Sequence, residues 1–228
     1  AQAPPGWRVV AVDQLGMGFS ERTGTPRRLA QRVEDLGRLT DVLEVSGPVY
    51  TLAHDWGGPV SLGWALRHQE DLAGVVLTNT AVHQPAESAP PALIRLARAP
   101  GLLARVCQQT PVFVRGTTAL SWPRLPLEVV RAFARPYLTP GRRAAVADFV
   151  RDIPFEEHHP SRAALNGIAE GLSALAEVPA LMVWGPRDPV FGERYLDDLL
   201  RRLPHADVQR YPSASHLVLE DRPEGVEV

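Results

Sequence analysis

One short stretch constrains the fold of this chain more than any other feature. Residues 54–58, with the sequence HDWGG, directly follow residues 49–53, an apolar run that predicts a buried strand. Pro59 comes next and suits the first turn of a helix. A strand that turns sharply into a helix needs small residues at the turn, and the two glycines supply them. The stretch therefore predicts a tight strand–turn–helix elbow with the Asp55 side chain at its apex.

Strands and helices alternate on both sides of this elbow. Further strands are predicted at residues 7–12, 72–77, 180–184 and 206–211, and helices at 27–43, 59–68 and 193–203. Alternation at this pitch indicates parallel βαβ units. We therefore expect residues 1–84 and 177–228 to form an α/β core with a mostly parallel sheet.

Residues 85–176 follow a different pattern. Prolines interrupt this part of the chain, its apolar residues recur at helical spacing, and no strand stands out. We expect a helical cap subdomain inserted into the α/β core. Trp122 and Phe149 either line a pocket in this cap or pack in its interior.

Three ionisable residues occupy the same kind of position, just past the carboxyl end of a predicted strand: Asp55, Asp188 and His216. Open α/β sheets place their active sites at that edge, and the order nucleophile, acid, histidine is that of α/β-hydrolase triads. We expect Asp55 to form a covalent ester, Asp188 to orient His216, and His216 to activate the water that cleaves the ester. The backbone N–H of Trp56 is the expected oxyanion donor.

Each member of this set also has an ordinary structural interpretation. Asp55 could cap the following helix, Asp188 could be a turn residue before Pro189, and His216 could be a loop histidine. Their shared placement at strand ends favours the catalytic interpretation. No Gly-x-Ser-x-Gly motif occurs in the chain, which disfavours a serine esterase.

Composition argues against several other classes of protein. The 228 residues carry a formal net charge of −2 without a polybasic run, so we expect no nucleic-acid partner. No apolar run reaches the ~18 residues of a membrane span, and the single cysteine, Cys107, allows no intrachain disulfide, so we expect a cytoplasmic protein. The pair His158 and His159 lacks ligand spacing, and residues 16–21 lack the third glycine of a dinucleotide loop. We therefore expect no metal and no cofactor.

Four strings together resemble the haloalkane dehalogenase family: residues 13–20 (DQLGMGFS), 54–58 (HDWGG), 184–191 (WGPRDPVF) and 215–218 (SHLV). The resemblance runs nearly end to end. Residues 78–85 and the cap are similar to the branch that contains the β-lactone decarboxylases of bacterial long-chain olefin synthesis. The resemblance implies an α/β-hydrolase fold with a helical cap, a small hydrophobic alkyl substrate, and association with other enzymes of a lipid or hydrocarbon pathway.

The resemblance assigns the same roles to the triad and implies that Trp56 donates its indole N–H to a leaving halide or a substrate oxygen. Some family members take the triad acid from the end of the strand before the cap. Asn79 occupies that region here, which leaves Asp188 as the acid.

Two alternatives stay open. An epoxide hydrolase shares the HDWGG elbow, but its ring opening requires two cap tyrosines, and the expected cap holds only Tyr137. A non-enzymatic hydrolase-fold binding protein typically loses a triad member, whereas all three are present here.

The resemblance also implies strands that precede residue 7. One of them would lie between the strands at 7–12 and 49–53, and its exit loop would supply the second oxyanion donor. We therefore expect a fragment whose N-terminal strands are missing, and a natural protein longer by at least ~40 residues, enough for three strands and their loops. The fragment alone is expected to be inactive or poorly stable.

Overall fold

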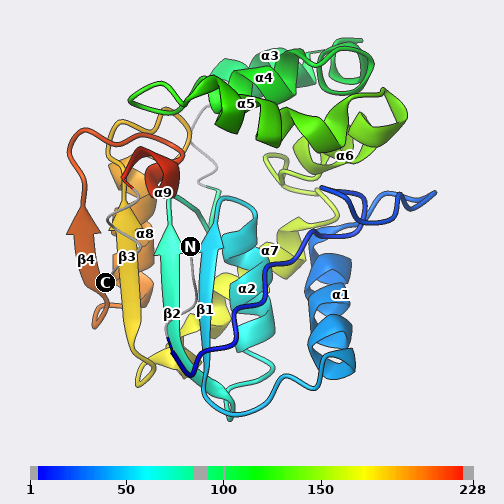
Figure 1. Ribbon diagram of the computed structural model, residues 1–228. Helices are drawn as coiled ribbons and strands as arrows, with labels where there is room; N and C mark the ends of the chain where they lie inside the picture. The colour runs from blue at the N-terminus through cyan, green and yellow to red at the C-terminus, as the bar shows by residue number, and fades with distance from the viewer. Residues whose placement is uncertain (1–4, 85–91, 100, 223–228) are drawn as a thin grey trace.

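A parallel sheet of four strands lies at the centre of the chain in a computed structural model that describes residues 5–84, 92–99 and 101–222 (Figure 1). The strands are β1 (Val49–His54), β2 (Leu72–Thr78), β3 (Ala180–Trp184) and β4 (Asp207–Arg210). They lie side by side in that order, and each neighbouring pair is parallel. All four carboxyl ends therefore meet at one edge of the sheet.

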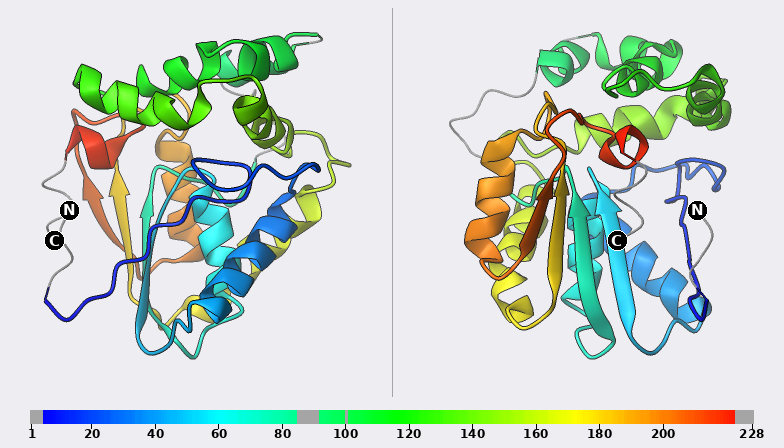
Figure 2. Two further views of the ribbon diagram at one scale, coloured as in Figure 1. Left: turned by 45° about the vertical axis from the view of Figure 1, so that its right-hand side comes forward. Right: turned by 60° about the vertical axis from the view of Figure 1, so that its left-hand side comes forward.

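The helices fall into two groups. The helices of the first group, together with a 3₁₀ turn, pack against the sheet: α1 (Leu29–Val42), α2 (Gly57–Ala65), α7 (Arg162–Gly171), η4 (Leu172–Leu175) and α8 (Glu193–Arg202). The helices of the second group form a layer above the carboxyl edge: α3 (Ala92–Arg98), η1 (Ala104–Gln109, a π-helix), α4 (Val112–Thr118), α5 (Leu127–Ala134), η2 (Arg135–Tyr137), η3 (Gly141–Arg143) and α6 (Ala144–Arg151) (Figure 2). A short helix, α9 (Val218–Asp221), follows the last strand.

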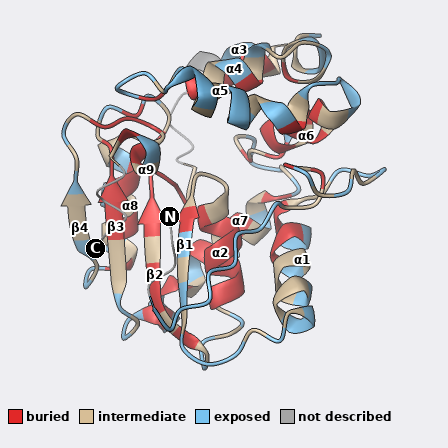
Figure 3. Ribbon diagram, viewed as in Figure 1, coloured by how far each residue is buried: buried red, intermediate tan, exposed pale blue. Residues whose placement is uncertain are grey.

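One large apolar core joins the sheet to the first group of helices. Its fully buried side chains include Leu62 of α2, Leu77 of β2 and Leu196 of α8. Figure 3 shows buried residues concentrated in the sheet and in these helices, whereas α5 has no buried residue. The second group has a core cluster of its own around Val146 and Cys107, and burial raises the pKa of the Cys107 thiol to about 11.

Helix α7 lies within the range 85–176 predicted to form the cap, yet its side chains belong to the main core. Leu165 and Ile168 are buried there with residues of α1 and α2. Periodicity alone cannot separate the two groups, because all of these helices carry an apolar stripe.

The strand predicted at residues 7–12 is wrong. This segment is extended and runs past β1, but it forms no ladder with it, and Val9 is 69% exposed. Its contacts to the core region are a ring contact between Trp7 and Tyr50 at 5.2 Å and a hydrogen bond from Arg8 to the Leu43 carbonyl. A β-branched run has strand propensity, but a strand also needs a neighbour that pairs with its backbone groups.

The remaining predicted strands and helices of the α/β core are confirmed, with no end displaced by more than three residues. The α/β core with a parallel sheet, expected from the sequence, is therefore present. In the part of the chain that the structure describes, no helix is both long and apolar enough to cross a membrane.

Candidate active site

The elbow after β1 holds Asp55 in a strained backbone conformation. Its φ is +49°, which is uncommon for a residue with a side chain. The Asp55 backbone N–H donates to the Asn79 carbonyl at 3.2 Å, and the Thr80 hydroxyl donates to the Asp55 carbonyl at 2.5 Å. A Cβ atom at Gly58 would collide with the Thr80 side chain, so the elbow requires a glycine there.

The Asp55 carboxylate does not occupy the N-cap position of helix α2. The N-cap residue of α2 is Trp56, and it makes no side-chain capping bond. The helix-cap interpretation of Asp55 is thus wrong, because its side chain reaches His216 instead.

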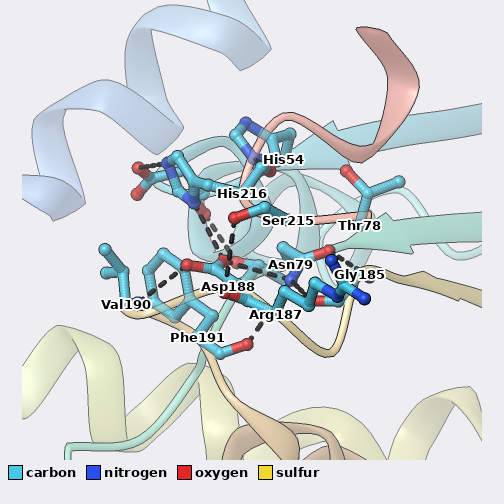
Figure 4. Close-up of polar contacts among 12 residues, drawn as sticks. His54, Thr78, Asn79, Gly185, Arg187, Asp188, Val190, Phe191, Ser215 and His216 are labelled. Carbon is cyan, nitrogen blue, oxygen red and sulfur yellow. Dashed lines mark hydrogen bonds and ion pairs between the residues drawn. The ribbon is translucent and has the colours of Figure 1, made fainter. Parts of the chain in front are cut away.

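The structure brings the three predicted triad residues into one row. His216 Nδ1 lies 2.9 Å from Asp188 Oδ2 (Figure 4). On the other side of the ring, His216 Nε2 lies 3.3 Å from Asp55 Oδ2. Asp188 and His216 are buried, whereas the Asp55 side chain is 37% exposed and faces a cavity. One imidazole thus joins a buried carboxylate to an accessible one.

The charges of these three residues shift the pKa values of His216 and Asp55. Burial acts to lower the pKa of His216, but hydrogen bonds to Asp188 and Asp55 and their negative charges raise it to about 10. Burial likewise acts to raise the pKa of Asp55, yet the hydrogen bond and charge of His216 keep it below its usual value. At neutral pH His216 is therefore an imidazolium, and Asp55 beside it is ionised.

Asn79 is a site residue whose contacts sequence reasoning missed. Its Nδ2 donates to Asp188 Oδ2 at 3.0 Å and to the Gly185 carbonyl at 2.9 Å, and its Oδ1 accepts from the Gly185 N–H at 2.8 Å (Figure 4). Asp188 Oδ1 accepts the Val190 N–H at 2.7 Å. The Asp188 carboxylate is thus held by Asn79 at the end of β2 and by the backbone of the turn that follows β3. The signal was available, since Asn79 follows a strand end as the triad residues do.

His54 is the second residue whose role was missed. It precedes Asp55, its Nε2 lies 2.8 Å from the His216 carbonyl, and the two rings are 4.7 Å apart. Burial lowers the pKa of His54, so its ring is neutral. Because a carbonyl can only accept, the Nε2–H of His54 donates and helps to hold the backbone of His216.

A cavity of about 430 Å³ opens between the carboxyl edge and the helices above it. Asp55, Trp56 and His216 lie on its floor, and the walls are largely apolar. The upper walls include Phe113, Val114, Phe133, Val146, Phe149 and Val150. Phe149 thus lines the cavity, whereas Trp122 is 54% exposed and lines a small separate depression. The arrangement places the Asp55 carboxylate at the floor of a cavity that suits an apolar ligand.

Donors for a metal ion do not gather in the described residues: no three His, Cys, Asp or Glu side chains form a group there that could hold one. His159 contacts the carbonyl of Arg151 at the surface, and His158 is exposed.

The chain belongs to the alpha/beta hydrolase fold family, whose model matches residues 1–223. A cis-3-alkyl-4-alkyloxetan-2-one decarboxylase of Xanthomonas campestris pv. campestris is 34% identical, over 96% of this chain and 76% of its own length. Haloalkane dehalogenase 2 of Mycobacterium bovis is 27% identical, over 96% of this chain and 76% of its own length. These relatives confirm the resemblance drawn from the four strings.

A solved structure agrees with this assignment. The haloalkane dehalogenase DatA from Agrobacterium tumefaciens C58 superposes with a TM-score of 0.82, covering 93% of this chain and 75% of that one. Its sequence identity is 20%, so the likeness concerns the fold.

Proposed function

We propose that this protein is an enzyme that uses Asp55 as a nucleophile and forms an aspartyl ester with a hydrophobic alkyl substrate. The observation that carries the proposal is the row Asp55–His216–Asp188, whose accessible carboxylate faces an apolar cavity. The greater identity to the oxetanone decarboxylase, 34% against 27%, favours a β-lactone with two alkyl chains over a haloalkane.

Ester formation needs an ionised Asp55, and the lowered pKa of this residue supports it. A carboxylate oxygen attacks an alkyl carbon, a C–O bond forms, and the leaving group departs with the bonding electron pair. With a haloalkane the leaving group is halide. With a β-lactone it is the ring oxygen, which becomes a free carboxylate on the same substrate. The indole N–H of Trp56 is our candidate donor to this developing negative charge.

The second step differs between the two substrates. A haloalkane ester needs water: His216 takes a proton from water, the hydroxide adds to the ester carbonyl, and the alcohol leaves with a proton. A ring-opened β-lactone needs no water: its C–C bond to the carboxylate breaks, carbon dioxide leaves, and the electron pair forms an alkene while expelling Asp55 as a carboxylate. Both routes restore Asp55.

Formation of the ester also prepares His216 to act as a base. Two carboxylates raise its pKa in the free protein, and esterification of Asp55 removes one of these charges. The pKa of His216 therefore falls, and the imidazolium releases its proton to solvent before it takes a proton from the hydrolytic water. Asp188 keeps its bond to Nδ1 throughout, so the free Nε2 faces the ester.

The nucleophile assignment predicts that Asp55→Asn abolishes turnover. The test incubates the purified protein separately with a 1-haloalkane, a long-chain cis-β-lactone and an aryl epoxide, and measures halide, alkene and diol. His216→Gln should still accumulate the haloalkyl ester on the peptide containing Asp55, as seen by mass spectrometry. Turnover retained by Asp55→Asn at the wild-type rate would refute the assignment.

The epoxide arm tests the closest alternative. Epoxide opening needs hydroxyl donors, and two tyrosines, Tyr137 and Tyr195, line the cavity. The Tyr195 hydroxyl already donates to Gln84 Oε1 at 3.4 Å, and the Tyr137 hydroxyl accepts the Gly18 N–H at 2.9 Å. Since the two come from different elements and Tyr195 is engaged, this arrangement supports the epoxide reaction less well.

A further inference from the structure

Arg32 of helix α1 is a buried cation that contacts no acidic side chain among the described residues. It is 3% exposed, and its Nη1 makes two long hydrogen bonds of 3.4 Å, to Gln14 Oε1 and to the Leu15 carbonyl. No described residue accepts a hydrogen bond from its Nε. Burial lowers the pKa of Arg32 to about 10, so the side chain is still charged at neutral pH. Such a group is costly to bury and requires compensation.

The face of an aromatic ring supplies part of that compensation. The guanidinium carbon of Arg32 lies 3.5 Å from the ring centroid of Phe149, on helix α6. An aromatic face attracts a cation, and the attraction is strongest where water is excluded. The planar guanidinium also fixes the plane of the ring that it covers.

Phe149 in turn contacts the residue next to the nucleophile. Its ring meets the Trp56 ring edge to face, with centroids 5.7 Å apart and planes at 71°. Phe149 and Trp56 both line the cavity that Asp55 faces, whereas Arg32 does not. Arg32, Phe149 and Trp56 thus form a row from α1, across α6, to the elbow.

A second contact between the same two helices holds the backbone of α6 in place. Asp152 follows α6 and is buried. Its Oδ2 accepts the Leu29 N–H at the start of α1, and its Oδ1 accepts from Arg28, both at 2.9 Å. With the backbone fixed at Asp152, the contact with Arg32 determines how the Phe149 ring is oriented.

We propose that Arg32 is a positioning residue: it holds the ring of Phe149, and through that ring it sets the orientation of the Trp56 indole beside Asp55. Arg32 touches no substrate. The inference rests on the proposed function, in which the Trp56 indole N–H binds the leaving group. Helix α1 would thus help to build the leaving-group site, although none of its residues lines the cavity.

The test compares Arg32→Met with Arg38→Met as a matched control. Arg38 lies on the same helix, but its side chain is 70% exposed and pairs with Glu34. We expect Arg32→Met to lower the rate of ester formation about tenfold, the change that about 1.4 kcal/mol produces, with little effect on KM. Arg32→Lys should restore part of this loss, since it keeps the charge, and Arg38→Met should match wild type.

A double-mutant cycle with Phe149→Leu separates positioning from general stability. If Arg32 acts through the ring, Arg32→Met should have little further effect on the rate in the Phe149→Leu background. Equal losses in both backgrounds, or no loss in either, would overturn the proposal.

A fluorescence measurement that needs no substrate tests the positioning role of Arg32 even if the proposed function is wrong. The emission of Trp56, obtained by subtracting the spectrum of the matching Trp56→Phe protein, should shift to longer wavelength in Arg32→Met and stay unchanged in Arg38→Met. If no substrate is turned over by wild type but this shift occurs, the proposed function fails while the positioning survives. An unshifted Trp56 spectrum in folded Arg32→Met protein rejects the positioning.

Discussion

Asn79 is an uncharged residue that holds one member of the row Asp55–His216–Asp188 in place. Its amide joins Asp188 to the backbone at the end of β3, so the acid cannot turn away from His216. Its own φ is +30°, a conformation that Asn tolerates better than most residues. Both the side chain and the backbone of this residue therefore bear on the orientation of the acid.

We expect Asn79→Gly to lower kcat by roughly 10- to 100-fold, because the loss of a hydrogen bond to a charged group is worth about 1.5–3 kcal/mol. Glycine keeps the positive φ, so backbone strain is not added. Asn79→Ala should lose the same activity and additional stability. Steady-state kinetics and thermal melts of the two proteins check this, and an Asn79→Gly protein with unchanged kcat would show that Asp188 needs no such support.

At the residue scale, the sequence locates those site residues whose place depends only on their position along the chain. Asp55, Asp188 and His216 each come after a strand, and parallel strands bring these ends together. The partners of Asn79 and Arg32 are not visible in the same way, because Asp188 and Phe149 lie more than 100 residues further along. Only the folded chain reveals such pairs.

The elbow between β1 and α2 is an element whose geometry depends on one of its two glycines. A Cβ atom at Gly58 would overlap the Thr80 side chain, whereas a Cβ at Gly57 would lie 3.8 Å from the Ala53 Cβ, an ordinary contact. Thr80 also bonds the Asp55 carbonyl. A side chain at position 58 would therefore displace the residue that hydrogen-bonds to Asp55, our proposed nucleophile.

Gly58→Ala is expected to lower the free energy of unfolding by about 1–3 kcal/mol, the usual cost of overpacking, and to reduce activity. Gly57→Ala is the matched control and should be neutral or slightly stabilising, since alanine favours a helix. Urea denaturation of both variants measures the difference. Equal stability of the two would mean that Thr80 moves aside without cost.

Helices and strands were predicted correctly where the residue pattern of a segment is enough to determine its structure. The prediction failed where strand formation depends on a neighbouring strand. Residues 72–77 are apolar and lie between two strands that they pair with. Residues 7–12 are similarly apolar, yet no described strand pairs with them. A high strand propensity allows a segment to form a strand, and an adjacent strand that can pair with it determines whether it does.

On the scale of the whole molecule, protonation of the triad is linked to folding. The pKa of His216 is about 10 in the folded protein and near 6.5 in an unfolded chain. A raised pKa contributes stability that is complete below pH 6.5 and is lost as the pH rises toward 10. Asp55 has the opposite linkage, but its lowered pKa places that effect in the acid range.

We therefore expect the melting temperature of wild type to fall relative to that of His216→Gln as the pH rises from 6.5 to 10. Comparison with this variant cancels the contribution of groups that are present in both proteins. Thermal melts at half-unit pH intervals measure the difference. Parallel curves for the two proteins would contradict a raised pKa of His216.

Helix α6 both lines the cavity and is attached to helix α1 through the residue that follows it. Val146, Phe149 and Val150 face the cavity, and Asp152 and Arg28 tie the end of the helix to α1. A change that widens the cavity from this helix therefore also disturbs its attachment. Laboratory evolution toward bulkier substrates should find its first tolerated changes on α4 and α5, and changes on α6 should become acceptable only with compensating substitutions in α1.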